Sequence, residues 1–202
     1  IGWCDWSSDV CSSDLEANMG VNKANYFLYR NIEREVEIGE KIIKNKLKII
    51  YENTSKSTNW PAGDYKNYLR VYIPAESRVE EVNWSESGSG EKNIVSGENL
   101  KINLNGSKRE VGFLVTVPIS KKIEVEVKYS AEIDLSKVTT FSYLNYVQKQ
   151  SGYGETNIVS LISVPTNWQI NAAEPVASVV GGKLLFNQKL EKDIKMGVEI
   201  ER

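Results

Sequence analysis

Strict alternation of apolar and polar residues is the feature that most restricts the fold of this chain. The segment 123–129 reads Ile-Glu-Val-Glu-Val-Lys-Tyr, with apolar and charged residues in turn along its whole length. A β-strand points successive side chains to opposite faces, so this segment buries one face and exposes the other. The same period of two recurs in 32–38, 47–51, 69–73, 100–104, 111–117 and 194–200. The sequence therefore predicts a chain built from β-strands.

Glycine and asparagine mark the turns between the predicted strands. Asn105-Gly106 and Gly181-Gly182 are typical of tight hairpin turns. The short connection 118–122 predicts a further hairpin between 111–117 and 123–129. The segment 33–48 is rich in Glu and Lys, as helices often are, but Gly39 interrupts it and the alternation continues. We therefore interpret 33–48 as two strands joined by a turn at Gly39-Glu40.

Many short strands separated by turn signals predict the fold class. About ten to twelve strands at a spacing of about 8–12 residues are typical of sandwiches and barrels. We expect an all-β, antiparallel β-sandwich of immunoglobulin or fibronectin type, with two packed units. Composition shifts near residue 134, so 32–133 is expected to form the first unit. Residues 134–202 then form a second, smaller unit or complete the first, and 16–31 are a linker that leads into the first strand.

Composition excludes several kinds of chemistry. The 202 residues include 25 basic and 27 acidic residues, two cysteines and no histidine. Without histidine there is no Ser-His-Asp or Cys-His couple and no His-ligated zinc, and two cysteines cannot form a four-thiolate site. A net charge of −2 gives no general field for nucleic acid or an anionic membrane. We therefore expect no catalytic residue, no cofactor, no metal site and no nucleic-acid partner.

The first fifteen residues show neither helical nor strand periodicity. The stretch 5–15, Asp-Trp-Ser-Ser-Asp-Val-Cys-Ser-Ser-Asp-Leu, resembles the translation of a standard short-read sequencing adapter at all eleven positions. We expect 1–15 to be a disordered, adapter-derived artefact and the natural N-terminus to be missing. Both cysteines and three of the 27 acidic residues lie in it, so the rest has no cysteine and 24 acidic against 25 basic residues.

The segment 59–68, Asn-Trp-Pro-Ala-Gly-Asp-Tyr-Lys-Asn-Tyr, is the densest cluster of binding-type residues. Aromatic rings, an acid, a base and amides around a Pro/Gly turn are the groups that recognise a sugar or peptide, with a ring as stacking platform. The candidate binding residues are Trp60, Asp64, Tyr65, Lys66 and Asn67. In the alternative interpretation, Trp60 fills one end of the core and Tyr65 or Tyr68 hydrogen-bonds the loop backbone.

Two other polar groups have a functional and a structural interpretation. In the functional interpretation, the segment 22–26, Asn-Lys-Ala-Asn-Tyr, seats a ligand or contacts an upstream domain. In the structural interpretation, which we favour, it is an ordered linker whose amides satisfy backbone groups. Glu124 and Glu126 have the chemistry of a general acid and base, as do Glu80 and Glu81. The first pair shares the wet face of a strand, where nothing raises a pKa, so we interpret it as a solvated face.

Four stretches, in order along the chain, resemble one protein family. They are 16–30 (Glu-Ala-Asn-Met-Gly-Val-Asn-Lys-Ala-Asn-Tyr-Phe-Leu-Tyr-Arg), 60–74 (Trp-Pro-Ala-Gly-Asp-Tyr-Lys-Asn-Tyr-Leu-Arg-Val-Tyr-Ile-Pro), 146–152 (Tyr-Val-Gln-Lys-Gln-Ser-Gly) and 164–168 (Val-Pro-Thr-Asn-Trp). Together they resemble the C-terminal β-rich region of the domain-of-unknown-function 4012 proteins. The resemblance implies a bacterium of the uncultured candidate phyla, an N-terminal membrane helix and a large extracytoplasmic portion. It carries over no catalytic residue.

These observations lead to one expected function and two alternatives. We expect a non-catalytic extracytoplasmic β-sandwich module of a membrane-anchored cell-envelope protein, with its anchor outside this fragment. It is alternatively a carbohydrate- or cell-wall-binding module that uses Trp60, Asp64 and Tyr65, or an accessory domain of an upstream envelope enzyme. The expected partners are a cell-wall glycan, another envelope protein or the upstream domain. An environmental, metagenomic assembly fits the adapter-like stretch.

Overall fold

The computed structural model describes residues 13–19, 22–150 and 154–202, and its architecture is all-β. Its strands are β1 (Ser13–Asn18), β2 (Leu28–Ile38), β3 (Ile42–Asn53), β4 (Tyr65–Pro74), β5 (Arg78–Glu86), β6 (Asn93–Ile94), β7 (Lys101–Asn105), β8 (Lys108–Val117), β9 (Lys122–Glu132), β10 (Thr140–Val147), β11 (Thr156–Ser163), β12 (Gln169–Glu174), β13 (Ser178–Val180), β14 (Lys183–Lys189) and β15 (Ile194–Glu201). The helices of the described ranges are short 3-10 segments: η1 (Ala24–Phe27), η2 (Gly97–Asn99) and η3 (Leu135–Lys137). None of these helices has the length and apolarity that a membrane-spanning helix needs.

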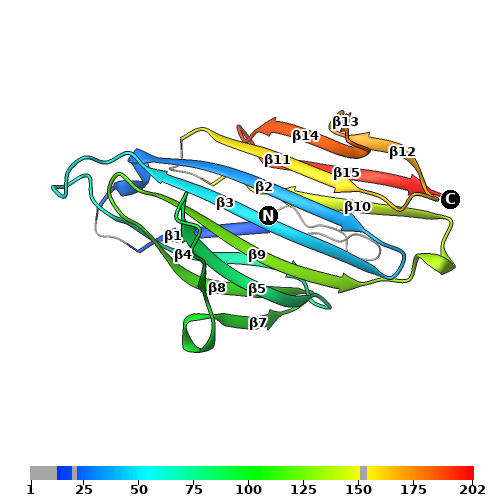
Figure 1. Cartoon of the computed structure of the whole chain (residues 1–202), viewed down its shortest axis with the longest axis horizontal. Helices are drawn as coiled ribbons and strands as arrows, with labels where there is room; N and C mark the ends of the chain where they lie inside the picture. The colour runs from blue at the N-terminus through cyan, green and yellow to red at the C-terminus, as the bar shows by residue number, and fades with distance from the viewer. Residues whose placement is uncertain (1–12, 20–21, 151–153) are drawn as a thin grey trace.

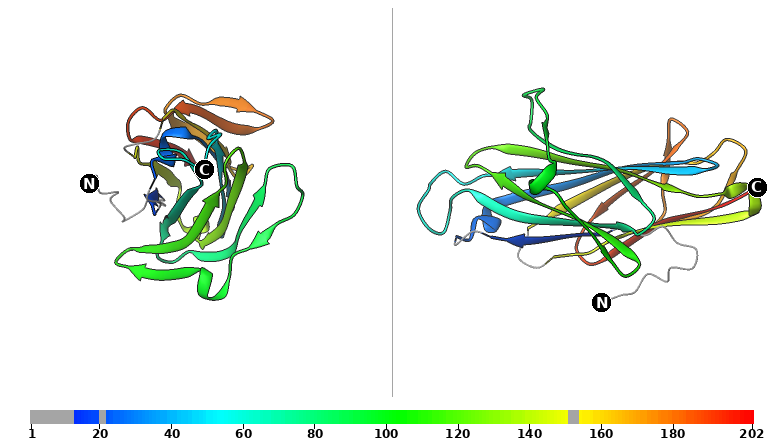
Figure 2. Two further views of the ribbon diagram at one scale, coloured as in Figure 1. Left: turned by 90° about the vertical axis from the view of Figure 1, so that its left-hand side faces the viewer. Right: turned by 90° about the horizontal axis from the view of Figure 1, so that it is seen from below.

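The strands form three sheets that share one interior. The largest has the order β13-β14-β11-β2-β3-β9-β5-β6, and the smaller ones have the orders β1-β4-β8-β7 and β10-β15-β12. Figure 1 shows β2, β3 and β9 in front of strands of both smaller sheets, and the end-on view in Figure 2 shows the sheets curving around a common interior. Buried residues of all three sheets, such as Leu47, Val71 and Val198, belong to one hydrophobic cluster. Burial of this cluster is the main force that holds the layers together.

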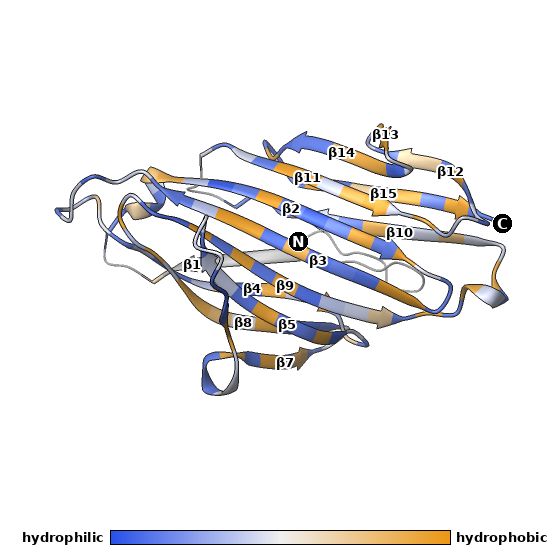
Figure 3. Cartoon of the chain, in the orientation of Figure 1, coloured by the Kyte–Doolittle hydropathy of each residue, from blue (hydrophilic) through white to orange (hydrophobic). Residues whose placement is uncertain are grey.

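The predicted alternation is confirmed along the central strands of the large sheet. In β2 every second residue is buried, and the residues between them, Glu33, Glu35 and Glu37, are exposed. In β3 the buried residues include Leu47 and Ile49. Figure 3 shows this as alternating blue and orange bands along the strands. The acidic side chains of β2 therefore lie on the outer face of the large sheet, whereas its inner face carries apolar residues together with the buried Arg30 and Arg34.

The segment 33–48 forms strands, as predicted, and no helix. β2 pairs antiparallel with β3 along its whole length, and the turn between them is closed by a 2.9 Å hydrogen bond from the Gly39 N–H to the Ile42 carbonyl. A Cβ at position 39 would lie 2.9 Å from that carbonyl oxygen. The glycine that interrupted the helix-like composition is therefore what permits the tight turn.

Two of the predicted hairpins are confirmed and the third is wrong. β7 pairs with β8 and β13 with β14, around the turns at Gly106 and at Gly181-Gly182. In contrast, β8 belongs to the four-stranded sheet and β9 to the eight-stranded sheet, so 111–117 and 123–129 do not pair. Alternation shows that a strand has one buried face but not which strand lies beside it. Here β8 pairs along its length with β4, and β9 pairs along its length with β3. The connection 118–121 therefore crosses from the four-stranded sheet to the eight-stranded sheet.

Strands from 134–202 are distributed over two sheets. β11 pairs in parallel with β2, and β14 and β13 extend the same sheet beyond β11. β10, β15 and β12 form the three-stranded sheet. The core cluster includes residues of both halves of the chain, for example Ile32 and Ile158. The large sheet is therefore built from both of the segments that the sequence analysis separates at residue 134.

The adapter-like stretch reaches into the described residues. Residues 1–12 lie outside them, whereas Ser13 to Leu15 form the first half of β1 and pair with Tyr72 to Arg70 of β4. This pairing differs from the disorder that we expected for 1–15. Its physical basis is that a sheet edge offers backbone donors and acceptors to any extended segment, whatever its side chains.

Candidate functional site

Two polar clusters that are separate in the sequence meet at one end of the molecule. The segment before β2 lies against the loop between β3 and β4. The Lys23 N–H donates to the Pro61 carbonyl at 3.0 Å, and the Asn22 Nδ2 donates to the Asp64 carbonyl at 3.1 Å. In Figure 1 this place is the left-hand end, where β2 begins and the long loop after β3 turns back. The Asn22 amide bonds the backbone of Asp64 and Ala24, as favoured from the sequence, and so also fixes the loop that carries Trp60.

Gly63 makes the close contact between these segments possible. Its φ is +129°, and a Cβ there would lie 2.7 Å from the Asn22 Nδ2. The Gly63 carbonyl accepts a 2.9 Å hydrogen bond from the Asn53 Nδ2, which also donates to the Val117 carbonyl at 3.1 Å. Asn53 is buried, so these bonds lie in the interior. One side chain thus joins the ends of β3 and β8 to the loop.

The five predicted site residues divide between the surface and the core. Trp60 is 70% exposed, and Asp64 and Lys66 are exposed, whereas Tyr65 and Asn67 are fully buried. Trp60 therefore does not fill the end of the core, and Tyr65 packs there against Tyr51 at a ring separation of 6.2 Å. The sequence contained this signal, because Tyr65 and Asn67 continue the odd-numbered apolar face of 69–73. A surface ligand reaches only the other three residues.

A depression of about 450 Å³ lies beside these residues. It is lined by Met19, Asn22, Thr58, Gly63, Asp64, Lys66 and Ile119. The Asp64 Oδ1 accepts a 3.0 Å hydrogen bond from the Ile119 N–H, so this carboxylate also fixes the β8–β9 connection. We call the depression together with Lys23, Lys56 and Trp60 the Trp60 end. The contributions of Met19, Lys56 and Thr58 carry no signal in the sequence pattern.

The Trp60 end combines an exposed aromatic ring with exposed lysines. The Lys23 ammonium lies 5.9 Å from the centroid of the Trp60 ring, within the range of a cation–π contact. Lys56 and Lys66 are exposed, and among the described residues none of the three lysines forms an ion pair. Tyr26, three residues after Lys23, is 83% exposed. Such a surface offers a ring for stacking and charged hydrogen-bond donors around it.

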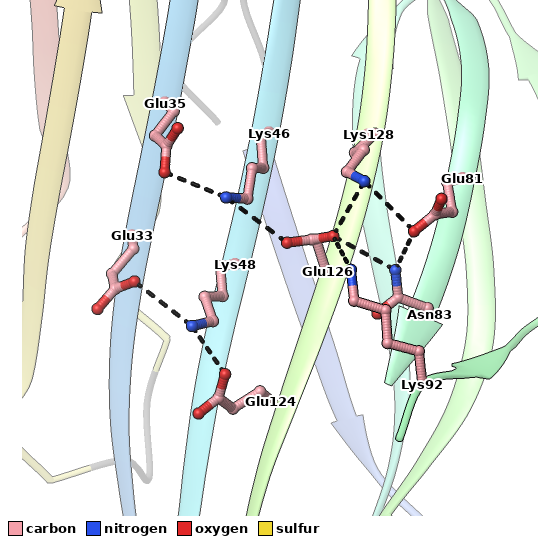
Figure 4. A network of polar contacts seen from close by, with 10 residues as sticks. All are labelled: Glu33, Glu35, Lys46, Lys48, Glu81, Asn83, Lys92, Glu124, Glu126 and Lys128. Carbon is pink, nitrogen blue, oxygen red and sulfur yellow. Dashed lines mark hydrogen bonds and ion pairs between the residues drawn. The ribbon is translucent and has the colours of Figure 1, made fainter. Parts of the chain in front are cut away.

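The outer face of the large sheet forms a second polar feature, shown in Figure 4. Lys48 bridges Glu33 at 3.9 Å and Glu124 at 2.7 Å, and Lys46 bridges Glu35 at 3.2 Å. Around Glu126 the contacts are to Lys46, Lys92, Lys128 and Asn83. Acidic and basic side chains alternate from strand to strand, which favours the cross-strand pairs.

The electrostatics of Glu124 and Glu126 favour ion pairing over acid–base chemistry. The hydrogen bond from Lys48 lowers the pKa of Glu124 and outweighs partial burial. Partial burial raises the pKa of Glu126, but the hydrogen bonds from Asn83 and Lys92 and the charge of Lys128 leave it lowered. A general acid needs a pKa near the working pH, and both carboxyls are shifted away from it. Across the part of the chain that the structure describes, no group of three or more acidic residues is arranged to hold a metal ion.

Comparisons with known proteins give only distant structural likenesses. No protein-family model and no curated protein matches the chain. A proposed nutrient-binding protein of Legionella pneumophila is similar over 95% of this chain and 71% of its own, with a TM-score of 0.48 and 10% identity. An M1 zinc metallopeptidase of Deinococcus radiodurans is similar over 86% of this chain and 42% of its own, with a TM-score of 0.41 and 11% identity. A proposed protease of Parabacteroides distasonis is similar over 87% of this chain and 40% of its own, with a TM-score of 0.42 and 7% identity. The chain spans about two fifths of these two proteins, and none of the likenesses assigns it a function.

Proposed function

We propose that the chain is a non-catalytic β-sandwich module of an extracytoplasmic, membrane-anchored cell-envelope protein of the domain-of-unknown-function 4012 type. In this proposal the two smaller sheets form one layer of the sandwich and the eight-stranded sheet forms the other. The proposal is supported by the four stretches that resemble the family and by an outer sheet face whose carboxylates are held in ion pairs. Mixed-charge sheet faces of this kind favour solubility, and the lowered pKa values of Glu124 and Glu126 argue against acid–base chemistry on this face.

We further propose that the module binds a glycan at the Trp60 end. The observation that carries this proposal is the 70% exposure of Trp60 next to a depression lined by both polar and apolar side chains. Large aromatic side chains are usually packed, and an exposed ring presents an apolar face on which a sugar ring stacks. Asn22, Thr58 and Asp64 lie in the depression and can hydrogen-bond sugar hydroxyls.

Tryptophan fluorescence during a titration with soluble cell-wall glycan fragments tests the glycan proposal. We expect a saturable change in emission that is lost in Trp60→Ala and kept in Trp84→Ala. Trp84 is the matched control because it is 36% exposed, lies on β5 and does not line the depression. The same saturable change in Trp60→Ala, or none in the unaltered protein, would show that Trp60 is not a glycan platform.

A further inference from the structure

We infer that the glycan bound at the Trp60 end is acidic, with carboxylate groups on its sugars. This inference rests on the proposed function and names the ligand class of the same site. Three lysines carry it: Lys23 from the segment before β2, Lys56 from the β3–β4 loop and Lys66 from the start of β4. Because the Lys23 backbone is bonded to Pro61 and the Met19 N–H to the Lys66 carbonyl, these segments are held together.

Lysines on the outer face of the large sheet, unlike those of the Trp60 end, are paired with carboxylates. There Lys46 and Lys48 each contact carboxylates on both neighbouring strands (Figure 4). At the Trp60 end, Lys23, Lys56 and Lys66 are exposed and contact no carboxylate among the side chains that the structure describes, those of residues 19, 22–150 and 154–202. A positive charge that the protein itself does not neutralise attracts an anionic ligand and selects against a neutral one.

The acid of the site does not cancel these charges. Asp64 is the acidic residue among the lining residues of the depression, and its Oδ1 is engaged by the Ile119 N–H. Lys66 lines the same depression. Lys23 lies against Trp60 and Lys56 belongs to the same β3–β4 loop, so the Trp60 end as defined carries three positive charges and one negative charge.

The placement of Lys23 explains how one ligand could use both the ring and the charge. Its ammonium lies 5.9 Å from the centre of the Trp60 ring. A uronic acid presents a sugar face for stacking and a carboxylate at the edge of the same ring. A carboxylate at that edge would therefore approach Lys23 while the sugar lies against the indole, and charge-assisted hydrogen bonds of this kind are stronger than neutral ones.

The experiment compares one polysaccharide in two charge states. Short fragments of polygalacturonate and their carboxyl-reduced, neutral product are titrated into the protein at low salt and again at about 0.5 M NaCl, where screening shortens the range of charge interactions to a few ångströms. We expect the acidic fragments to bind about tenfold more tightly at low salt, and the two forms to converge at high salt. Equal affinity at both salt concentrations overturns the inference but leaves the glycan proposal intact. Binding of neither form overturns both.

Two double variants identify the charges responsible. Lys23→Gln with Lys66→Gln should bring the affinity for the acidic fragments down to that for the neutral ones, so that the tenfold ratio between the two forms falls to about one. Lys101→Gln with Lys183→Gln removes the same charge from exposed positions on β7 and β14 and should change neither. Equal losses in both double variants would attribute the preference to net charge and overturn the inference. Circular dichroism checks that all variants are folded.

Discussion

The Tyr143 hydroxyl donates a 2.8 Å hydrogen bond to the Asn45 Oδ1 across the interior of the protein. Tyr143 lies in β10 of the three-stranded sheet and Asn45 in β3 of the eight-stranded sheet, and both are buried. Burial raises the pKa of Tyr143, so the hydroxyl stays protonated and remains a donor. A residue that follows the break at 134 is thus tied directly to one of the first strands of the chain.

Tyr143→Phe should destabilise the protein by about 1–3 kcal/mol, because it leaves the Asn45 amide oxygen buried without this donor. Urea unfolding measures the loss. Tyr26→Phe is the control, because Tyr26 is 83% exposed and the substitution removes a hydroxyl that faces solvent. Equal stability of the two variants would mean that the inter-sheet bond contributes nothing.

Gly63→Ala should cost more stability than Gly88→Ala. Both glycines have a positive φ, of +129° and +83°, which costs a non-glycine residue on the order of 1 kcal/mol or more. Only at position 63 would the new methyl group also meet a neighbour, the Asn22 Nδ2 at 2.7 Å. Thermal unfolding ranks the two variants, and the glycan titration should weaken in Gly63→Ala alone. The reverse order would show that the contact with Asn22 adjusts freely.

Glu40→Gln should lower stability at neutral pH and matter little in acid. Hydrogen bonds from Asn167 and Trp168 and the Arg202 guanidinium lower the pKa of Glu40, against a smaller effect of burial. Because the pKa is lower in the folded state, this stabilisation is complete above the ordinary glutamate pKa, about 4.3, and is lost as the pH falls through the folded value. Urea unfolding at pH 7 and pH 3 checks this, with Glu91→Gln as the exposed control. A difference between Glu40→Gln and the parent that is as large at pH 3 would contradict the assignment.

Lys48 and Glu124 should be energetically coupled, and Lys44 and Glu37 should not. The Lys48 Nζ lies 2.7 Å from the Glu124 Oε2, and the two side chains are 28% and 23% exposed. The Lys44 Nζ lies 3.9 Å from the Glu37 Oε2, and these side chains are 56% and 66% exposed. Double-mutant cycles with glutamine should give about 0.5–1 kcal/mol for the first pair and about zero for the second. In 1 M NaCl the first value should shrink. Equal coupling energies would mean that burial does not strengthen these pairs.

Part of the candidate site was predictable and part was not. Residues 59–68 attract notice by composition, and Trp60, Asp64 and Lys66 of this segment do reach the surface. The alternation of 69–73, extended backwards, places Tyr65 and Asn67 in the core. Lys23 could not be assigned to the site from the sequence, because its approach to Trp60 depends on a loop contact between residues far apart in the chain.

By itself, the sequence determined the all-β class, most strands and the turns at Gly39, Gly106 and Gly181-Gly182, since side-chain alternation and backbone freedom at glycine are local properties. The tertiary structure decided which strands pair. β8 and β9 lie next to each other in the chain but in different sheets, whereas β2 and β11 lie far apart in the chain and pair in parallel. Any exposed ladder of backbone groups accepts any strand of matching length, so the neighbour is chosen by burial of the common core and not by local sequence.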